Sequence, residues 1–267
     1  MRAGLSVGGR WVGAEARLRV VALGVALGMI GCLWAQPAVG VQVGAVASGA
    51  DYTYGMRSKV GEPGHFIYGD HARAYWPGVT FPDGTFFQAG VVDSDNGWGS
   101  DKCSTGFATF ETALYGGHSL FSDLYNIRNC NYSGDHYFTL DRSYSSTDTL
   151  WKWKLEGKKV GPTLHFSNFT NTSFQKKNAG AISEIVYVGN IPSGLPFPTV
   201  EYSPSIQFKN SSGVFEGATH GRALISSDRN GLCQYAVKSP GHNQVVTGKS
   251  GNINPPQCYS NGDDLWN

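Results

Sequence analysis

Residues 181–189, Ala-Ile-Ser-Glu-Ile-Val-Tyr-Val-Gly, form an apolar stretch with one carboxylate, Glu184, near its centre. Its β-branched and aromatic residues predict a β-strand. A carboxylate in such a strand is costly unless it has hydrogen-bond partners or stays protonated. A second apolar stretch, residues 85–92, carries a single amide, Gln88, in the same way. Two polar side chains, each alone in an apolar strand, indicate a site rather than a surface.

Outward from these two stretches, short β-type runs alternate with turn residues, and no amphipathic helix of useful length interrupts them. The turn at Pro82-Asp83-Gly84 has a clear mechanism, because proline presets φ and glycine accepts a positive one. This pattern is typical of a sandwich or jelly roll. We predict an all-β fold, an antiparallel two-sheet β-sandwich of the concanavalin A type, in one domain over residues 61–267. The predicted strands are 65–69, 73–81, 85–93, 106–115, 136–141, 147–156, 159–166, 181–189 and 199–210.

The first 35 residues read as a secretory signal peptide, in which four arginines accompany an apolar run over residues 20–35. That run is too short and too rich in glycine to favour a spanning helix, which needs about 20 apolar residues. Cleavage after Ala35 would give a secreted protein. The sequence Met29-Ile30-Gly31-Cys32 loosely resembles a lipoprotein box, so a lipid anchor at Cys32 is the alternative. Residues 36–60 read as a flexible leader or a pro-segment.

Charge and cysteine content narrow the class of protein. Without residues 1–35, the chain has 17 basic and 19 acidic side chains, a net charge of −2. Nothing basic remains to attract nucleic acid, and we expect a monomer without a membrane anchor once the signal is removed. Four cysteines follow the signal, and in an exported chain they predict two disulfides. Of three possible pairings we favour Cys103–Cys130 and Cys233–Cys258, which each close a loop of about 25 residues, worth roughly 3 kcal/mol.

Several common sites have no motif in this sequence, including zinc-protease, nucleophile-elbow and nucleotide-binding motifs. Asp93 and Asp95 are candidate Ca²⁺ ligands on a turn, but their spacing does not complete an EF-type loop, and a solvated acidic turn explains them better. Trp76 is either a substrate-stacking or a core residue. Glu111 lies in the run 106–115 and is either a second site carboxylate or an ordinary strand charge.

The ordered motifs of residues 74–213 resemble the glutamic peptidases, also called eqolisins. A Trp-x-Gly-aliphatic strand of the family matches residues 76–79, and the Gln-Thr-Gly-aliphatic strand that follows it is similar to residues 88–91, Gln-Ala-Gly-Val. The segment 181–186 is similar to the Ala-Glu-Ile/Val strand of that family, and residues 197–210 are similar to the stretch after it. Phe110-Glu111 is similar to its Tyr-Glu pair. Three positions depart from the family pattern: Thr80, Phe107 and Thr109.

The resemblance implies a catalytic dyad of Gln88 and Glu184 in a secreted endopeptidase that acts at acidic pH on polypeptides, with Trp76 and Glu111 near the substrate. No metal or organic cofactor is needed for this chemistry. Glu184 would take the proton of the attacking water and return it to the leaving amine, and the Gln88 amide would bind the oxyanion. Two alternatives stay open. One is a non-catalytic carbohydrate-binding or cell-surface module. The other is a jelly-roll glycoside hydrolase that uses Glu184 with Glu111.

Overall fold

The structure is a computed structural model of the full chain. The described residues are 39–63, 71–82, 84–94, 108–115, 118–125, 134–144, 149–155, 158–159, 164–165, 173–187, 199–225, 235–249, 259 and 261–266.

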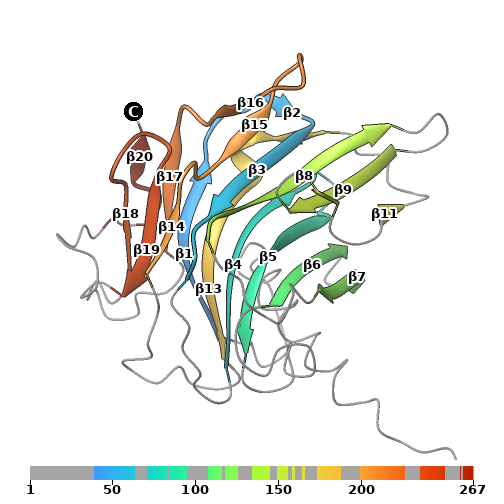
Figure 1. The fold of residues 1–267 in the computed structure, drawn as a ribbon. Helices are drawn as coiled ribbons and strands as arrows, with labels where there is room; N and C mark the ends of the chain where they lie inside the picture. The colour runs from blue at the N-terminus through green and yellow to red at the C-terminus, as the bar shows by residue number, and fades with distance from the viewer. Residues whose placement is uncertain are drawn as a thin grey trace, which may run out of the picture.

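The first sheet has eight strands, all antiparallel to their neighbours, and Figure 1 shows its central strands side by side. Their order across the sheet is β20 (Asp264–Trp266), β17 (Gly221–Ile225), β1 (Val39–Ala47), β13 (Ala179–Tyr187), β4 (His71–Thr80), β5 (Phe86–Ser94), β6 (Ala108–Tyr115) and β7 (His118–Tyr125).

The second sheet has ten strands, and antiparallel pairing again holds throughout. Its main path is β10 (Lys158–Lys159), β9 (Thr149–Leu155), β8 (His136–Tyr144), β3 (Gly55–Val60), β14 (Val200–Tyr202), β19 (Val245–Lys249) and β18 (Tyr235–Lys238). Beside this path lie β11 (Leu164–His165), β15 (Gln207–Lys209) and β16 (Phe215–Gly217). A separate pair joins β2 (Tyr52–Thr53) to β12 (Phe174–Gln175), and a 3-10 turn follows at Lys176–Asn178.

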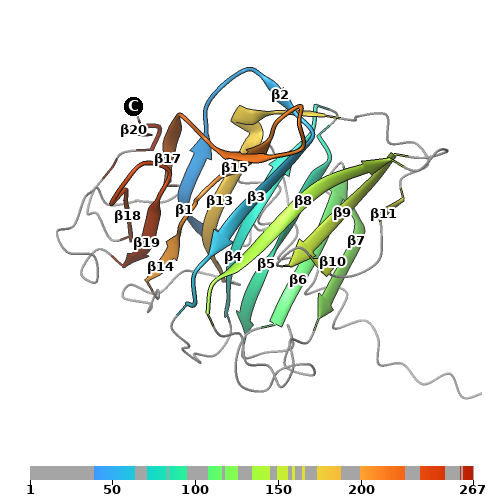
Figure 2. The same ribbon diagram turned by 45° about the horizontal axis from the view of Figure 1, so that its top comes forward.

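The two sheets lie face to face, as Figures 1 and 2 show from two directions. Alternate residues of the facing strands fill the space between the sheets, because successive side chains of a strand point to opposite faces. The first sheet contributes Val43, Ala45, Tyr75, Val79, Phe87, Ala89, Val91 and Ala181, and the second contributes Met56, Val60, Phe138, Leu140, Tyr202 and Val245. The predicted all-β antiparallel sandwich is therefore confirmed.

The predicted turn between β4 and β5 is also confirmed. Gly84 has φ of +84°, and its N–H donates to the carbonyl of Phe81 at 2.9 Å. Phe81 N–H in turn donates to Thr85 at 2.7 Å. This turn aligns β5 against β4 and so determines the position of Gln88 relative to Trp76.

The prediction that residues 36–60 are a loose leader is wrong for residues 39–60. Strand β1 lies between β17 and β13 in the first sheet, and β3 lies between β8 and β14 in the second. The error has a physical cause. Glycine and alanine alternate with valine in β1, and such a run has low intrinsic strand propensity, yet pairing on both edges and burial in the core override it. The tail beyond residue 213, for which no strand was predicted, supplies β16 to β20.

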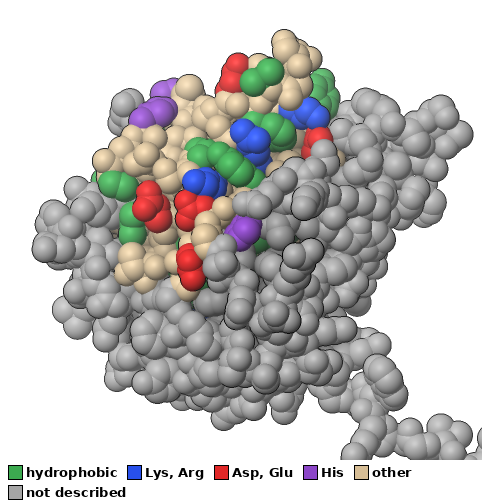
Figure 3. All heavy atoms as spheres, viewed as in Figure 1, with side chains coloured by type: hydrophobic (Ala, Val, Ile, Leu, Met, Phe, Trp, Pro, Cys, Tyr) green, Lys and Arg blue, Asp and Glu red, His purple; other side chains and the backbone are tan. Residues whose placement is uncertain are grey.

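The outward surface of the second sheet mixes acidic and basic groups, as Figure 3 shows for the described side chains of that view. Lys59 pairs with Asp135 at 2.8 Å, and Lys209 pairs with Asp141 at 2.5 Å. Arg57 lies between the rings of Tyr137 and Phe215, at 4.5 and 4.6 Å from their centroids. Local pairing of this kind leaves no broad basic patch on the described part of this surface.

No helix in the described residues combines the length and apolar character that crossing a membrane requires.

Candidate active site

Glu184 is fully buried on the face of the first sheet that is turned away from the second sheet. Its neighbour Ser183 bonds to residues of the second sheet, so Glu184 points the opposite way. We call this side the outer face. Cross-strand register places Gln42 of β1 opposite Glu184, and Trp76 lies two residues along β4 from the other partner, Ala74.

The carboxylate of Glu184 receives one N–H on each oxygen. Gln42 Nε2 donates to Oε1 at 3.0 Å, and Trp76 Nε1 donates to Oε2 at 3.2 Å. Burial disfavours the charged form and raises the pKa of Glu184 from 4.5 to about 7, although the hydrogen bonds from Gln42 and Trp76 act in the opposite direction. Glu184 is therefore a carboxyl group that can exchange a proton near neutral pH. Such perturbed groups concentrate at functional sites.

Gln88 lies on the same outer face, on β5. The register pairs Gln88 with Gly78 and Glu184 with Ala74. The two side chains are therefore offset by four residues along β4. The two backbone positions are thus roughly 13 Å apart along the strands and roughly 10 Å apart across them. The side chain is only 1% exposed, and its Oε1 has no hydrogen-bond partner. A buried, unpaired carbonyl oxygen of this kind suits a water molecule or a ligand that donates a hydrogen bond.

Trp76 occupies the space between Gln88 and Glu184. Its pyrrole N–H meets Glu184, while its benzene edge lies over Gly78, where an added β-carbon would be 2.7 Å from Cζ3. Gly90 on β5 leaves similar room, since a β-carbon there would lie 2.7 Å from Trp76 Cβ. Phe86 packs edge-on against the indole at 5.6 Å. The two glycines therefore let a large ring lie flat against the sheet beside the carboxyl group.

Directly behind Glu184, a network of hydroxyl groups joins β13 to the second sheet. Ser183 Oγ lies 2.8 Å from Tyr202 Oη and 2.5 Å from Thr247 Oγ1, and Tyr202 Oη donates to the carbonyl of Ile182 at 2.9 Å. All three side chains are fully buried. Burial raises the pKa of Tyr202 far above its ordinary value, so the phenol remains a neutral donor. The network holds β13 at a fixed distance from the second sheet, and this fixes the position of Glu184.

The other predicted site residues lie apart from this group or have side chains outside the described residues. Register aligns Glu111 with Ala89, a core residue, and aligns Thr112 with Gln88. By register, position 111 therefore belongs to the face of the sheet opposite to that of Gln88 and Glu184. This does not favour the pair Glu184–Glu111. Asp93 belongs to β5, but its side chain, like that of Thr109, is outside the described residues. Phe107, Asp95 and the four cysteines Cys103, Cys130, Cys233 and Cys258 also lie outside them. In the described part of the chain, no group of three or more His, Cys, Asp or Glu could hold a metal ion.

Gln42 is the site residue that sequence reasoning missed. It is 3% exposed and bonds directly to Glu184, which is 142 residues away in sequence. The signal was present, because residues 39–47 are apolar except for this one amide, the same signature that marked Gln88 and Glu184. It was missed because the segment was interpreted as a leader.

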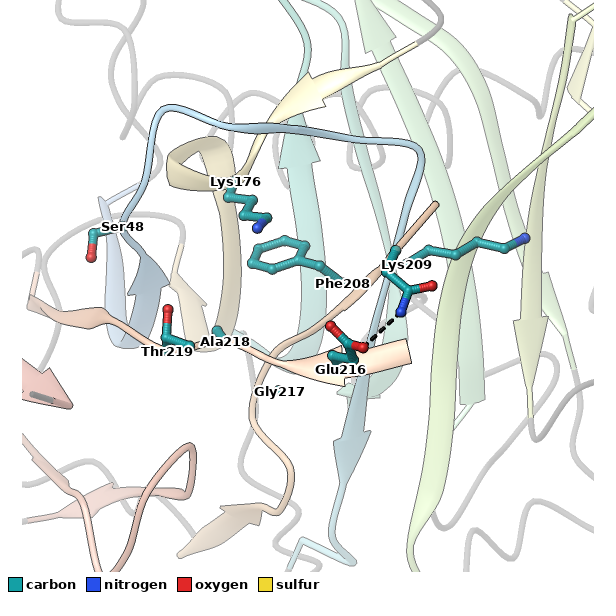
Figure 4. A pocket seen from close by; sticks show the side chains of 9 residues that line it. Ser48, Lys176, Phe208, Lys209, Glu216, Gly217, Ala218 and Thr219 are labelled. Carbon is teal, nitrogen blue, oxygen red and sulfur yellow. Dashed lines mark hydrogen bonds between the residues drawn. The ribbon is translucent and has the colours of Figure 1, made fainter. Parts of the chain in front are cut away.

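A separate small pocket of about 120 Å³ lies near the β15–β16 hairpin (Figure 4). Lys176 Nζ lies 5.8 Å from the centroid of the Phe208 ring, and Asn210 Nδ2 donates to Glu216 Oε1 at 2.6 Å. None of the residues that line it belongs to the group around Glu184. The pocket is therefore independent of the candidate active site.

Comparison with known proteins gives matches of structure only. No family model matches the sequence, and a search of curated proteins also finds no match. Among solved structures, Scytalido-glutamic peptidase with a peptide-based transition-state analogue is 15% identical, with a TM-score of 0.49, and the alignment covers 79% of this chain and 98% of that one. SCP-B, a member of the eqolisin family of peptidases bound to the tripeptide Ala-Ile-His, is 16% identical over the same shares, with a TM-score of 0.44.

A third similar structure is a Bacteroides ovatus GH16 protein from a mixed-linkage glucan locus, in complex with its product. It is 13% identical, with a TM-score of 0.36, and the alignment covers 56% of this chain and 68% of that one. The two peptidases come from the family that the sequence motifs resemble. Identities this low do not carry an activity over to this chain.

Proposed function

We propose that this chain is a peptide-bond hydrolase of the glutamic type, with Glu184 and Gln88 as its catalytic pair. One observation supports the proposal above all others. Glu184 is a fully buried carboxyl group that has two N–H donors, no cationic partner among the described residues and a pKa raised to about 7. A purely structural carboxylate in such surroundings would cost stability without any return.

The proposed reaction assigns each proton. Ionised Glu184 accepts a proton from a water molecule, whose oxygen attacks the carbonyl carbon of the scissile peptide bond. The side-chain NH₂ of Gln88 donates to the oxyanion that forms, an interaction typically worth about 3–4 kcal/mol. Protonated Glu184 then gives its proton to the amide nitrogen, the C–N bond breaks, and the carboxylate is restored. Trp76 fills the space between the two side chains in the resting structure, so joint action of Glu184 and Gln88 on one peptide bond requires the indole to move aside when substrate binds.

The pH dependence of this mechanism follows from the protonation state of Glu184. A pKa of about 7 means that the ionised fraction falls roughly tenfold for each pH unit below 7. The resting geometry therefore favours activity near neutral pH. The resemblance to glutamic peptidases favours an acidic optimum, which would need a lower pKa in the substrate complex. A pH profile of kcat/KM decides between these two forms of the proposal.

The decisive experiment uses the mature chain and a denatured protein substrate across a range of acidic to mildly alkaline pH. We expect Glu184→Gln to abolish digestion and Gln88→Ala to lower it about 100-fold or more. Glu201→Gln is the matched control, because it makes the same chemical change at an exposed position of the second sheet. The assignment fails if both site variants digest the substrate as fast as the wild type while circular dichroism shows them folded.

The alternative is a non-catalytic carbohydrate-binding or cell-surface module. Glu184 and Gln88 are at most 1% exposed, so a peptide must gain access to the outer face before it can react. If access is never gained, Glu184 and Gln88 take no part in catalysis. A glycan array, probed with and without a chelator, tests this function, and the proposed hydrolase would give no specific signal there.

We further propose that the protein is exported, with residues 1–35 removed and the cysteines paired as Cys103–Cys130 and Cys233–Cys258. The basic leader and the even number of remaining cysteines support this. Amino-terminal sequencing of the exported form and peptide mapping without reductant test the two parts separately.

A further inference from the structure

The two donors to Glu184 differ in what they can do when the carboxyl group gains a proton. An indole N–H is a donor only, so Trp76 can serve any oxygen that accepts. A primary amide has a donor end and an acceptor end. Gln42 therefore has a capacity that Trp76 lacks, namely to accept the O–H of a protonated carboxyl group once its amide has rotated.

We propose that Gln42 is a positioning residue whose side-chain amide holds Glu184 in both protonation states. Its N–H₂ donates to Oε1 of the carboxylate, as in the present geometry. When Oε1 carries a proton, the amide rotates by half a turn and its carbonyl oxygen accepts that O–H. Throughout, Trp76 donates to Oε2 and holds the carboxyl plane in place.

The Gln42 side chain is enclosed, so rotation of its amide must preserve the shape of the side chain. Gln42 is 3% exposed, so water does not readily substitute for its hydrogen bonds. The residues two positions before and after it on the same face of β1 are Gly40 and Gly44, and a β-carbon at Gly44 would lie 2.2 Å from the carbonyl oxygen of Ala181, so backbone of β13 lies close beside β1 there. Exchange of the amide ends leaves the shape of the side chain almost unchanged, so no neighbouring strand has to move.

No charged group among the described residues offers a competing explanation. On the strands that flank Glu184, the described titratable side chains are Arg73 and Tyr75 of β4, and both alternate with Trp76 onto the core-facing side. Tyr202 reaches β13 from the second sheet and contacts Ile182 and Ser183 there. The two neutral donors are thus the described side chains that respond directly to the protonation of Glu184.

The test follows the carboxyl carbon of Glu184 in isotope-labelled full-length protein by NMR, with Glu184→Gln to assign the signal. Gln42→Met, a near-isosteric change, removes both the donor to the carboxylate and the acceptor for the O–H, whereas Trp76→Phe removes only a donor to the carboxylate. We therefore expect the titration midpoint to rise less in Gln42→Met than in Trp76→Phe. Gln88→Met is the matched control, since Gln88 lies on the same face with similar burial but does not bond Glu184. Its midpoint should equal that of the wild type. A rise in Gln42→Met as large as that in Trp76→Phe overturns the proposal, because Gln42 would then support the carboxylate alone.

A second measurement needs no change at Gln42, in case that variant does not fold. In the wild type, the side-chain amide nitrogen of Gln42 should shift with pH at the same midpoint as the Glu184 carboxyl. In Glu184→Gln this shift should disappear. An amide signal that is insensitive to pH in the wild type also overturns the proposal.

The catalytic consequence of this inference rests on the proposed function. If Glu184 is the base, Gln42→Met should move the acidic limb of kcat/KM upward by the same amount as the carboxyl midpoint. If the wild type has no peptidase activity, the proposed function fails, whereas the two NMR measurements still decide the role of Gln42.

Discussion

Two adjacent residues of β13, Ser183 and Glu184, show opposite ways of burying a polar group. Ser183 faces the second sheet and joins a neutral hydroxyl network with Tyr202 and Thr247. Glu184 faces outward, where its partners are an amide and an indole N–H. Both side chains are fully buried. One face of the strand thus holds a neutral hydroxyl group. The other face holds a carboxyl group that changes its protonation state near neutral pH.

The two faces of this strand therefore differ in role: Ser183 contributes to packing, and Glu184 supplies a group that titrates. A saturated network of neutral hydroxyls stabilises the packing of two sheets and has little dependence on pH. A buried carboxyl group with a raised pKa stabilises the fold only while it is protonated. Stability measurements on variants of the two faces should therefore differ in their response to pH.

The largest expected effect is the pH dependence that Glu184 gives to stability. Its pKa in the folded state, about 7, exceeds the ordinary value of 4.5, so the folded state binds the proton more tightly. The stabilisation is fully present below pH 4.5 and is lost as the pH rises through about 7. The shift corresponds to about 3 kcal/mol. We expect urea unfolding to show the wild type losing about this much relative to Glu184→Gln over that interval.

Ser183→Ala is the control for this measurement, because it changes the neighbouring residue and removes no titrating group. Its free energy of unfolding should run parallel to that of the wild type across the whole pH range. Parallel curves for the wild type and Glu184→Gln would instead show that Glu184 is not held with a raised pKa.

The second effect, of intermediate size, is the loss of the phenol that links the sheets. Tyr202→Phe leaves the Ile182 carbonyl and the Ser183 hydroxyl without this partner. We expect a loss of about 2 kcal/mol in the free energy of unfolding, equal at acidic and neutral pH, because every group involved is neutral. Chemical denaturation at two pH values measures it. Tyr52→Phe, at a position 58% exposed, should cost nothing measurable. A loss that changes with pH would contradict the neutral network.

The smallest effect concerns the last hydroxyl of the network. Thr247→Val keeps the shape and the β-branch but removes the contact with Ser183 Oγ. We expect a loss of about 1 kcal/mol, since Ser183 retains its bond with Tyr202. Thr219→Val, the same change at an exposed position, is the control. If Thr247→Val and Thr219→Val have the same free energy of unfolding, Thr247 does not contribute to joining the sheets.

Sequence patterns predicted the strands that contain Gln88 and Glu184, the turn at Gly84 and the shared burial of the two polar side chains. These features depend on local chemistry: propensity, alternation and the conformational freedom of glycine. The pattern failed at β1, where small residues conceal a strand that is stabilised by both of its neighbours. It also failed in the tail, which contributes strands to both sheets.

By itself, then, the sequence determined that the chain forms an antiparallel β-sandwich and that a lone carboxylate and a lone amide lie within its apolar strands. Only the tertiary structure decided which amide meets Glu184. Alternation is a property of one strand, whereas the neighbours of a strand and their register depend on how the whole core packs. The sheet order brings β1 beside β13, so the direct partner of Glu184 is Gln42, and Gln88 lies beyond Trp76 on the far side of β4.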